Sequence, residues 1–513
     1  MKNEDLILIA DFGAQYAHLI SRRIRERGVR SEIIPYNTRI HDIIKKRPKG
    51  VVLSGGPASI YSNNSPKSDP ELLKINVPIL GICYGLQLIV HQEKGKVSQS
   101  ESSEYGRAEL IIKDNEDLFR NLGKKNNVWM SHGDKVESLP EGYDTLAYTE
   151  NSAFAAIRNK ERNIFAVQFH PEVVHTPEGG KILENFLYEI CKCKSNWTMD
   201  TFIQDSVNNI RKQVGPERVI CGVSGGVDST VSALLIHKAI SNRLTCIFVD
   251  HGMLRKGEAE DVVRILRDDI KMNLIYVNAS KQFLEKLKGV SDPELKRKII
   301  GEEFVSVFTR ESNKLGSFEW LAQGTLYPDI IESSGTGSPA SKIKSHHNVA
   351  GLPDWMNLKV IEPLRDLYKD EVRIIARLIG LPKKIANRHP FPGPGLAVRV
   401  IGELTYKKIQ ICRESSRIIE EELVKNKLYE KVWQGFAVVG DDKVVGVQGD
   451  KRTHGHIVTI RIVESVDAMT ADWFRIPYHI LELISNRITN EVRDVSLVTY
   501  AVSSKPPSTI EPQ

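Results

Sequence analysis

Short apolar runs alternate with longer stretches whose apolar positions recur at helical spacing. In the first part of the chain the runs 6–10, 51–53 and 79–80 are separated by helix-like stretches, among them 17–27 and 86–91. Such alternation is typical of a sheet of mostly parallel strands with helices on both faces. The pattern therefore predicts a doubly wound α/β domain at the start of the chain.

A second series of the same kind begins after Trp197, with strand-like runs at 219–223, 245–249 and 274–277. A polar stretch at 191–196 interrupts the pattern before it. Closely spaced prolines at 389–395 exclude helix and strand pairing alike. Beyond them, a helix-like stretch at 407–428 precedes strand-like runs at 436–439, 444–447 and 456–463. We expect two doubly wound, mostly parallel-sheet domains at 1–195 and 196–388, then a small α+β domain at 389–513.

Composition is that of an ordinary soluble protein. The 513 residues exceed what one core usually supports, and 41% are hydrophobic and 27% charged. The net charge of +6 is spread along the chain, so it suits small anionic substrates and requires no nucleic-acid surface. The six cysteines are too few and scattered for a disulfide framework. With neither a signal peptide nor an apolar run of membrane-spanning length, the sequence predicts a cytoplasmic protein without membrane association.

A glycine-rich turn lies between the strand-like run 219–223 and a helix-like run from 231. Such a turn directs backbone N–H groups and a helix N-terminus toward one point, which is an anion cradle. It lacks the Gly-Lys-Ser/Thr ending of a kinase-type loop, so it suits cleavage of ATP between the α- and β-phosphates. A plain turn would need only glycines, not three polar side chains. The loop resembles that of the ATP pyrophosphatase superfamily, and its candidate ATP-binding residues are Ser224, Gly225, Gly226, Val227, Asp228 and Ser229.

A cysteine stands between two glycines at the end of a predicted strand and just before a helix. This is the cysteine form of a nucleophile elbow, and the helix N-terminus favours the thiolate. A nucleophilic thiol also needs a base held by a third group. Alone, either motif would fit a buried cysteine or a capping histidine. Together they resemble the class I glutamine amidotransferases, which implies the catalytic residues Cys83, His170 and Glu172, with oxyanion donors at Gly56 and at the N–H of Tyr84.

Over essentially its full length the chain resembles the GMP synthetase (glutamine-hydrolysing) family, through motifs that include 249–257, 292–301, 322–327, 390–395 and 504–511. The resemblance implies that XMP, ATP and glutamine are the substrates, that Mg²⁺ accompanies ATP, and that the last domain pairs subunits into a homodimer. Ammonia from glutamine must then reach the acceptor shielded from water. The residues implied are Lys369 at the pyrophosphate, Asp228 as a candidate Mg²⁺ ligand, and Arg297, Asp450, Lys505 and Glu511 around XMP.

Other interpretations of single positions remain. Lys369 could be one charge on an amphipathic helix, and Asp450 a turn residue. Without the resemblance, Lys505 and Glu511 would be part of a solvated terminus. The small polar stretch 333–341 suggests a mobile lid, with Lys342 and Lys344 able to reach a phosphate.

The chain also departs from the family in two places. Glu93-Lys-Gly stands where a Gly-Gly pair is usual, and Glu511-Pro-Gln513 replaces the common Glu-Trp-Glu ending. There are three alternatives. The Lys-Pro-Pro motif argues against a glutamine-dependent NAD synthetase, and the intact catalytic residues argue against a nucleotide-sensing scaffold. The absence of a basic face argues against a nucleic-acid thiolation enzyme.

Overall fold

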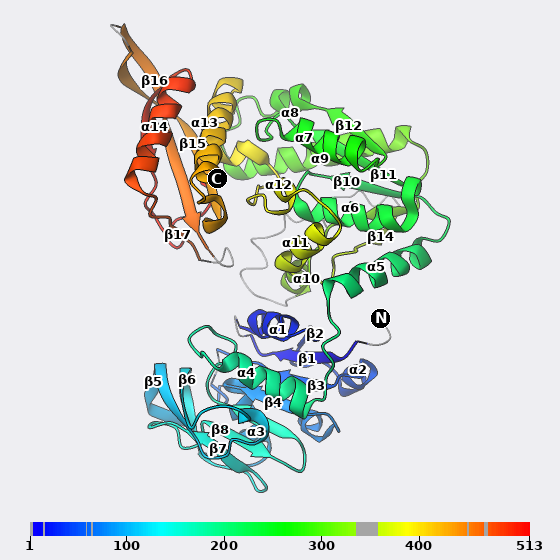
Figure 1. The fold of residues 1–513 in the computed structure, drawn as a ribbon, viewed down its shortest axis with the longest axis vertical. Coiled ribbons are helices and arrows are strands. Elements are labelled where there is room, and N and C mark those ends of the chain that lie inside the picture. Colours follow the sequence, from blue (N-terminus) through cyan, green and yellow to red (C-terminus); the bar gives the residue numbers. More distant parts are fainter. Residues whose placement is uncertain are drawn as a thin grey trace. The chain divides into compact units, whose positions relative to one another are not determined.

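The chain divides into two compact units, Met1–Phe202 and Ile203–Gln513 (Figure 1). The computed structural model describes residues 4–13, 16–57, 59–62, 65–334, 358–448, 451–465 and 470–513. Most of the predicted lid at 333–341, together with Lys342 and Lys344, lies outside these ranges, and so does Asp450. Within them, no helix has the length and apolar character needed to cross a bilayer. The predicted limits of three domains stay a prediction.

The first unit is built on a nine-stranded sheet in the order β2-β1-β3-β4-β9-β8-β7-β5-β6. Strands β2, β1, β3, β4 and β9 are parallel, as expected, and β8, β7, β5 and β6 continue the sheet in antiparallel pairs. The strands are β1 (Leu6–Asp11), β2 (Arg30–Pro35), β3 (Gly50–Leu53), β4 (Ile79–Ile82), β5 (Lys96–Ile112), β6 (Lys125–Ser138), β7 (Asp144–Tyr148), β8 (Ala156–Asn159) and β9 (Ile164–Val167).

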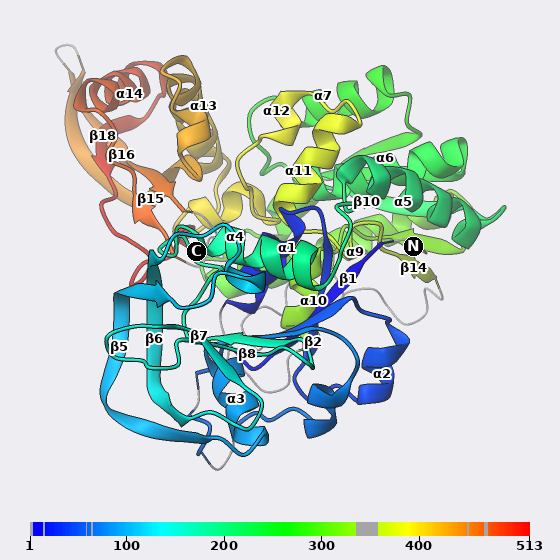
Figure 2. The ribbon, with the colours of Figure 1, turned by 60° about the horizontal axis from the view of Figure 1, so that its bottom comes forward.

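Helices lie on both faces of this sheet (Figure 2), and each face is covered by an apolar core. Side chains alternate along β1, so Ile7 and Ile9 enter one core while Leu6 and Leu8 enter the other. The first core contains residues of α1 (Ala17–Arg25) and α4 (Gly179–Glu184), and the second contains residues of α2 (Ile40–Lys45) and α3 (Tyr84–Gln92). A doubly wound arrangement follows.

The second unit contains a five-stranded, fully parallel sheet in the order β12-β11-β10-β13-β14. The chain begins this sheet at the central strand β10 and adds β11 and β12 on one side of it. It then crosses to the other side of β10 to add β13 and β14, so the topological switch point lies at β10. Its strands are β10 (Val219–Val223), β11 (Leu244–Asp250), β12 (Leu274–Asn278), β13 (Trp320–Ala322) and β14 (Lys359–Ile361). The helices are α5 (Met199–Val214), α6 (Val227–Ile240), α7 (Glu258–Val263), α8 (Ser280–Lys286), α9 (Pro293–Lys314), α10 (Tyr327–Ser334), α11 (Lys369–Leu378) and α12 (Lys383–Ala386).

The last part of the second unit is a smaller sheet covered by two helices. Strands β15 (Gln434–Gln448) and β16 (Lys451–Glu464) form a long antiparallel pair, joined by β17 (Asp472–Trp473) and β18 (Val495–Tyr500). The helices are α13 (Tyr406–Lys425) and α14 (Tyr478–Glu491). One apolar core runs from β10 and β11 through residues 396–404 into this sheet, so the two parts are packed as one body.

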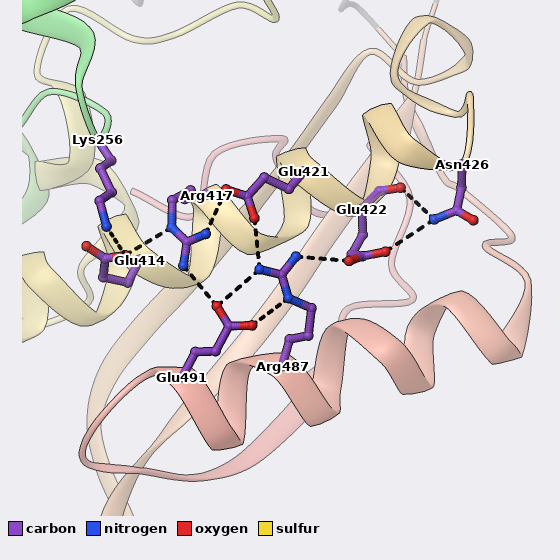
Figure 3. Close-up of polar contacts among 8 residues, drawn as sticks. All are labelled: Lys256, Glu414, Arg417, Glu421, Glu422, Asn426, Arg487 and Glu491. Carbon is purple, nitrogen blue, oxygen red and sulfur yellow. Dashed lines mark hydrogen bonds and ion pairs between the residues drawn. The ribbon is translucent and has the colours of Figure 1, made fainter.

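Charged side chains join α13 to α14 across their facing surfaces (Figure 3). Arg417 lies 2.7 Å from Glu421 and 3.1 Å from Glu491, and Arg487 lies 2.8 Å from Glu421 and 2.6 Å from Glu491. Each arginine therefore bridges carboxylates of both helices. We call Arg417, Glu421, Arg487 and Glu491 the α13–α14 ladder.

Candidate active sites

Cys83 occupies a strained turn between β4 and α3. Its φ is +53°, a conformation that residues other than glycine seldom adopt, and its N–H donates to the Val167 oxygen at 2.7 Å. The flanking glycines are required by close packing: a Cβ on Gly81 would lie 2.8 Å from the backbone of Gly85, and one on Gly85 would collide with the Leu53 oxygen. The turn matches the nucleophile elbow predicted from the sequence.

His170 and Glu172 lie at this turn, on the segment that follows β9. His170 Nδ1 is 2.7 Å from Glu172 Oε1, and both side chains are almost completely buried. Burial opposes the charged imidazole, but hydrogen bonds with Cys83 and Glu172 outweigh it and raise the pKa of His170 to about 11. A protonated His170 places a hydrogen-bond donor and a positive charge beside Cys83 Sγ. The structure thus brings the three predicted catalytic side chains together.

Several residues that the sequence motifs did not single out hold this arrangement in place. Gln168 Nε2 lies 3.7 Å from Cys83 Sγ. Thr176 donates from its hydroxyl to the His170 oxygen at 2.7 Å and accepts from the Trp129 N–H at 3.1 Å. Arg23 Nε donates to the main-chain oxygen of Glu172 at 3.1 Å. The Trp129 and Arg23 contacts come from β6 and α1, which are distant from His170 in the sequence, so no local motif could reveal them.

The predicted oxyanion donors lie close to one another. A Cβ on Gly56 would lie 3.2 Å from Tyr84 Cγ and 3.1 Å from the Phe12 oxygen, so the loop 53–57 packs directly on the start of α3. The N–H of Tyr84 is in the first turn of α3, where N–H groups have no acceptor within the helix. The two predicted donors therefore lie on segments that pack against each other.

The predicted phosphate loop connects β10 to α6 at the switch point of the parallel sheet. Gly225 has φ +79°, and an added Cβ would lie 2.9 Å from Val262 Cγ2. Ser224 and Ser229 close the loop, because their hydroxyl oxygens are 3.0 Å apart and the Ser224 N–H donates to Ser229 Oγ at 3.2 Å. Gly226 caps α6, so Val227 and Asp228 lie in the first helical turn. In doubly wound sheets, the crevice at the switch point is where ligands bind.

Asp228 and Lys369 meet at this loop. Lys369 Nζ donates to Asp228 Oδ2 at 3.1 Å, and Lys369 is the first residue of α11. Among the residues that the structure describes, the other carboxylate oxygen, Asp228 Oδ1, is buried and has no hydrogen-bond partner. An unpartnered carboxylate oxygen is the kind of ligand that Mg²⁺ prefers, and Mg²⁺ is usually held by one or two carboxylates together with substrate phosphates. Asp228 therefore fits the predicted metal role.

Three of the four predicted XMP residues are described, and each of them contacts another part of the second unit. Arg297, on α9, donates from Nη2 to the main-chain oxygen of Gln513 at 2.5 Å. Glu511 accepts two hydrogen bonds from Arg399, at 2.8 and 3.0 Å. Lys505 pairs its backbone with Ala471, with N–O distances of 2.7 and 3.1 Å.

The tail is thus fixed, and the interpretation of Lys505 and Glu511 as a solvated terminus is wrong. The missing Trp-Glu ending does not release the tail either. Lys296, which is fully buried, donates to Gln513 Oε1 at 2.6 Å and to the Val400 oxygen at 2.8 Å. No local pattern predicts these two hydrogen bonds, because Lys296 is distant along the chain from both Val400 and Gln513.

The other departure from the family lies at the end of α3. Lys94 has φ +68°, and the N–H of Gly95 donates to the Val90 oxygen at 2.8 Å, which is a Schellman ending. Lysine stands at the position that glycine usually fills. Glu93 pairs with Arg162 through two hydrogen bonds, so the turn is held from outside.

Three family models match the chain. They describe a class-I glutamine amidotransferase over residues 8–190, an NAD synthase over 198–298 and a GMP synthase C terminal domain over 421–512. The first unit is therefore a class I amidotransferase domain, and the parallel sheet of the second is an NAD synthase-like ATP pyrophosphatase domain. The chain combines a glutaminase with an ATP-dependent synthetase.

Curated relatives match along the full chain. A protein named GMP synthase (glutamine-hydrolyzing) from Carboxydothermus hydrogenoformans is 55% identical, covering 98% of this chain and 99% of the relative. Proteins of the same name from Brachyspira hyodysenteriae and Aquifex aeolicus are 53% and 54% identical, over 99% and 98% of this chain and 99% of each relative. The chain belongs to the glutamine-hydrolysing GMP synthase family.

Proposed function

We propose that this enzyme converts XMP to GMP, using glutamine as the nitrogen donor and cleaving ATP to AMP and pyrophosphate. The observation that carries the proposal is the presence, in one chain of this family, of a Cys83–His170–Glu172 site and of a phosphate loop at a sheet switch point. The first can release ammonia and the second can bind ATP. An enzyme with only one of these activities would not need the other site.

In the first unit, the Cys83 thiolate attacks the amide carbon of glutamine. The N–H groups of Gly56 and Tyr84 bind the oxygen as its negative charge develops. His170, held by Glu172, gives a proton to the departing ammonia, and water then hydrolyses the thioester to glutamate. In the free site, Cys83 and Glu172 raise the pKa of His170, so the imidazole carries a proton that it can transfer once Cys83 Sγ is bonded to the amide carbon.

In the second unit, the oxygen on C2 of XMP attacks the α-phosphorus of ATP, and pyrophosphate leaves. Backbone N–H groups of Gly225 and Gly226, together with Ser224 and Ser229, bind the leaving phosphates, and Lys369 neutralises their charge. Mg²⁺, entering with ATP, would be held by Asp228 Oδ1 and would supply further positive charge. Ammonia then attacks C2 of the adenylylated XMP, and AMP leaves.

The assay that tests this function supplies the purified protein with XMP, ATP, Mg²⁺ and glutamine. GMP, AMP, pyrophosphate and glutamate are expected in equal amounts. ADP and inorganic phosphate as products would contradict the assigned cleavage. NAD formation from a deamido precursor would favour the alternative drawn from the NAD synthase match.

We further propose that the enzyme works in the cytoplasm as a homodimer joined through its last domain. The apolar side chains that the last domain exposes support the pairing, among them Val447, Tyr478 and Val502, which are 76, 89 and 60% exposed. Light scattering of the purified enzyme should give twice the chain mass of 57.8 kDa. A mass of one chain at assay concentration would contradict it.

A further inference from the structure

Arg399 is buried at the point where three segments of the second unit meet. It ends the 3₁₀ turn Gly395–Arg399 and is 3% exposed. Its guanidinium carbon lies 4.0 Å from the ring centre of Phe436 on β15 and 4.9 Å from that of Phe391 in the proline-rich stretch. Stacking against two rings fixes the plane of the guanidinium.

That plane presents two parallel donors to one carboxylate. Arg399 Nε donates to Glu511 Oε2 at 3.0 Å, and Nη2 donates to Oε1 at 2.8 Å. Gln434 Nε2 adds a third hydrogen bond to Oε1 at 2.9 Å while also donating to the Pro390 oxygen at 2.7 Å. Such a fork holds a carboxylate in one orientation, which a lysine could not do.

The three bonds leave part of Glu511 available. A carboxylate has about four lone-pair sites, of which Oε1 uses two and Oε2 one in these contacts. The remaining site on Oε2 can accept a hydrogen bond from a ligand. A carboxylate repels phosphate, so the partner must be an O–H or N–H of the nucleoside part of a nucleotide.

We propose that Arg399 is a positioning residue that, with Gln434, orients Glu511 to accept a hydrogen bond from the nucleoside part of XMP. The inference rests on the proposed function and adds to it the group that the tail recognises. Arg399 itself does not touch the substrate. It acts through Glu511, so its loss should change XMP binding and leave ATP binding unchanged.

A double-mutant cycle with ammonia as nitrogen donor tests this, because that assay does not depend on the first unit. Arg399→Gln should raise the KM for XMP by about tenfold or more, the effect of losing charge-assisted hydrogen bonds. The KM for ATP should stay within about twofold, because the hydrogen bonds between Arg399 and Glu511 do not contribute to the phosphate loop that binds ATP. Glu511→Gln should raise the KM for XMP to a similar extent. Because both residues act through the same contact, the KM of the double variant should be no higher than that of the more impaired single variant.

The matched control is Arg487→Gln, which removes an arginine with three carboxylate partners in the same unit but away from the tail. Its KM for XMP should be unchanged. Should Arg399→Gln fail to fold, Gln434→Met keeps the buried cation and removes one bond to Glu511. A severalfold rise in its KM for XMP would support the proposal.

Three results would overturn the inference while leaving the proposed function intact. They are an unchanged KM for XMP in Arg399→Gln or Gln434→Met, an equal rise in the KM for ATP, and additive losses in the double variant. By contrast, an unmodified enzyme that forms no GMP from XMP and ammonia would contradict the proposed function itself.

Discussion

Cys83 holds a backbone conformation that costs free energy, and the surrounding packing maintains it. A φ of +53° puts its side chain at the start of α3, within reach of His170. The sequence predicted this turn because the two flanking glycines and the strand-helix seam are local features. It could not predict Gln168, Thr176 or Arg23 as supports, since their contacts depend on tertiary packing.

Replacing Cys83 with alanine separates the two activities. Cys83→Ala should abolish glutamine-dependent GMP formation and leave ammonia-dependent formation unchanged, because the thiol acts only in the first unit. Steady-state rates with each nitrogen source measure this. Cys193→Ala, which removes another buried thiol of the same unit, should retain both activities. Equal loss of both activities in Cys83→Ala would refute the assignment.

Lys94 offers a test of backbone strain away from the chemistry. Lys94→Gly should raise the free energy of unfolding by about 1 kcal/mol, because glycine adopts φ near +68° without the penalty of a side chain. Urea denaturation measures the change. Gln204→Gly, at an exposed interior position of the helix α5, is the control and should lower stability by about 0.5–1 kcal/mol. A destabilised Lys94→Gly would show that the side chain itself is needed.

At the scale of elements, α13 and α14 are joined by charge as well as by apolar packing. Hydrogen bonds from Arg487 and, against the opposing effect of burial, from Arg417 lower the pKa of Glu491 from its ordinary 4.5 to about 2. A carboxylate whose pKa is lowered by folding contributes stability above about pH 4.5 and loses it as the pH falls toward 2. Because the ladder is partly exposed, salt and solvent reduce its contribution.

The contribution of the ladder to stability should therefore be measurable when thermal unfolding is followed at decreasing pH. Between about pH 6 and pH 3 the unmodified enzyme should lose more thermal stability than Glu491→Gln, which has no charge to lose at this position. Glu116→Gln, at an exposed pair 3.6 Å from Lys160, should resemble the unmodified enzyme. Parallel pH curves for Glu491→Gln and the unmodified enzyme would mean that the ladder contributes nothing.

The elements that the sequence predicted best are those with local signals. The apolar run 219–223 is β10, and the stretch 407–428 is α13 within a few residues. The antiparallel strands β5–β8 were missed, because long, mostly polar strands such as β6 alternate burial without forming a continuous apolar run. The predicted runs 436–439 and 444–447 are parts of one strand, β15, with an irregularity between Val439 and Lys443.

At the scale of the whole molecule, each unit presents one half of a joint reaction. The class I amidotransferase fold places a nucleophile at the end of β4, and the parallel sheet of the second unit places a phosphate loop at the end of β10. The tail is held by Arg297, Lys296 and Arg399 on the second unit. These tail contacts join residues more than 100 positions apart, so only family resemblance, and no local pattern, pointed to the tail.

In the proposed reaction, the oxygen on C2 of XMP takes the adenylyl group at the Asp228 loop. XMP labelled with ¹⁸O at C2, followed by mass spectrometry of the products, shows where this oxygen goes. The label should appear in AMP, with one ¹⁸O per molecule, and Asp228→Asn should suppress its transfer with either nitrogen source. Label found in pyrophosphate, in inorganic phosphate or in water, with none in AMP, would contradict the account.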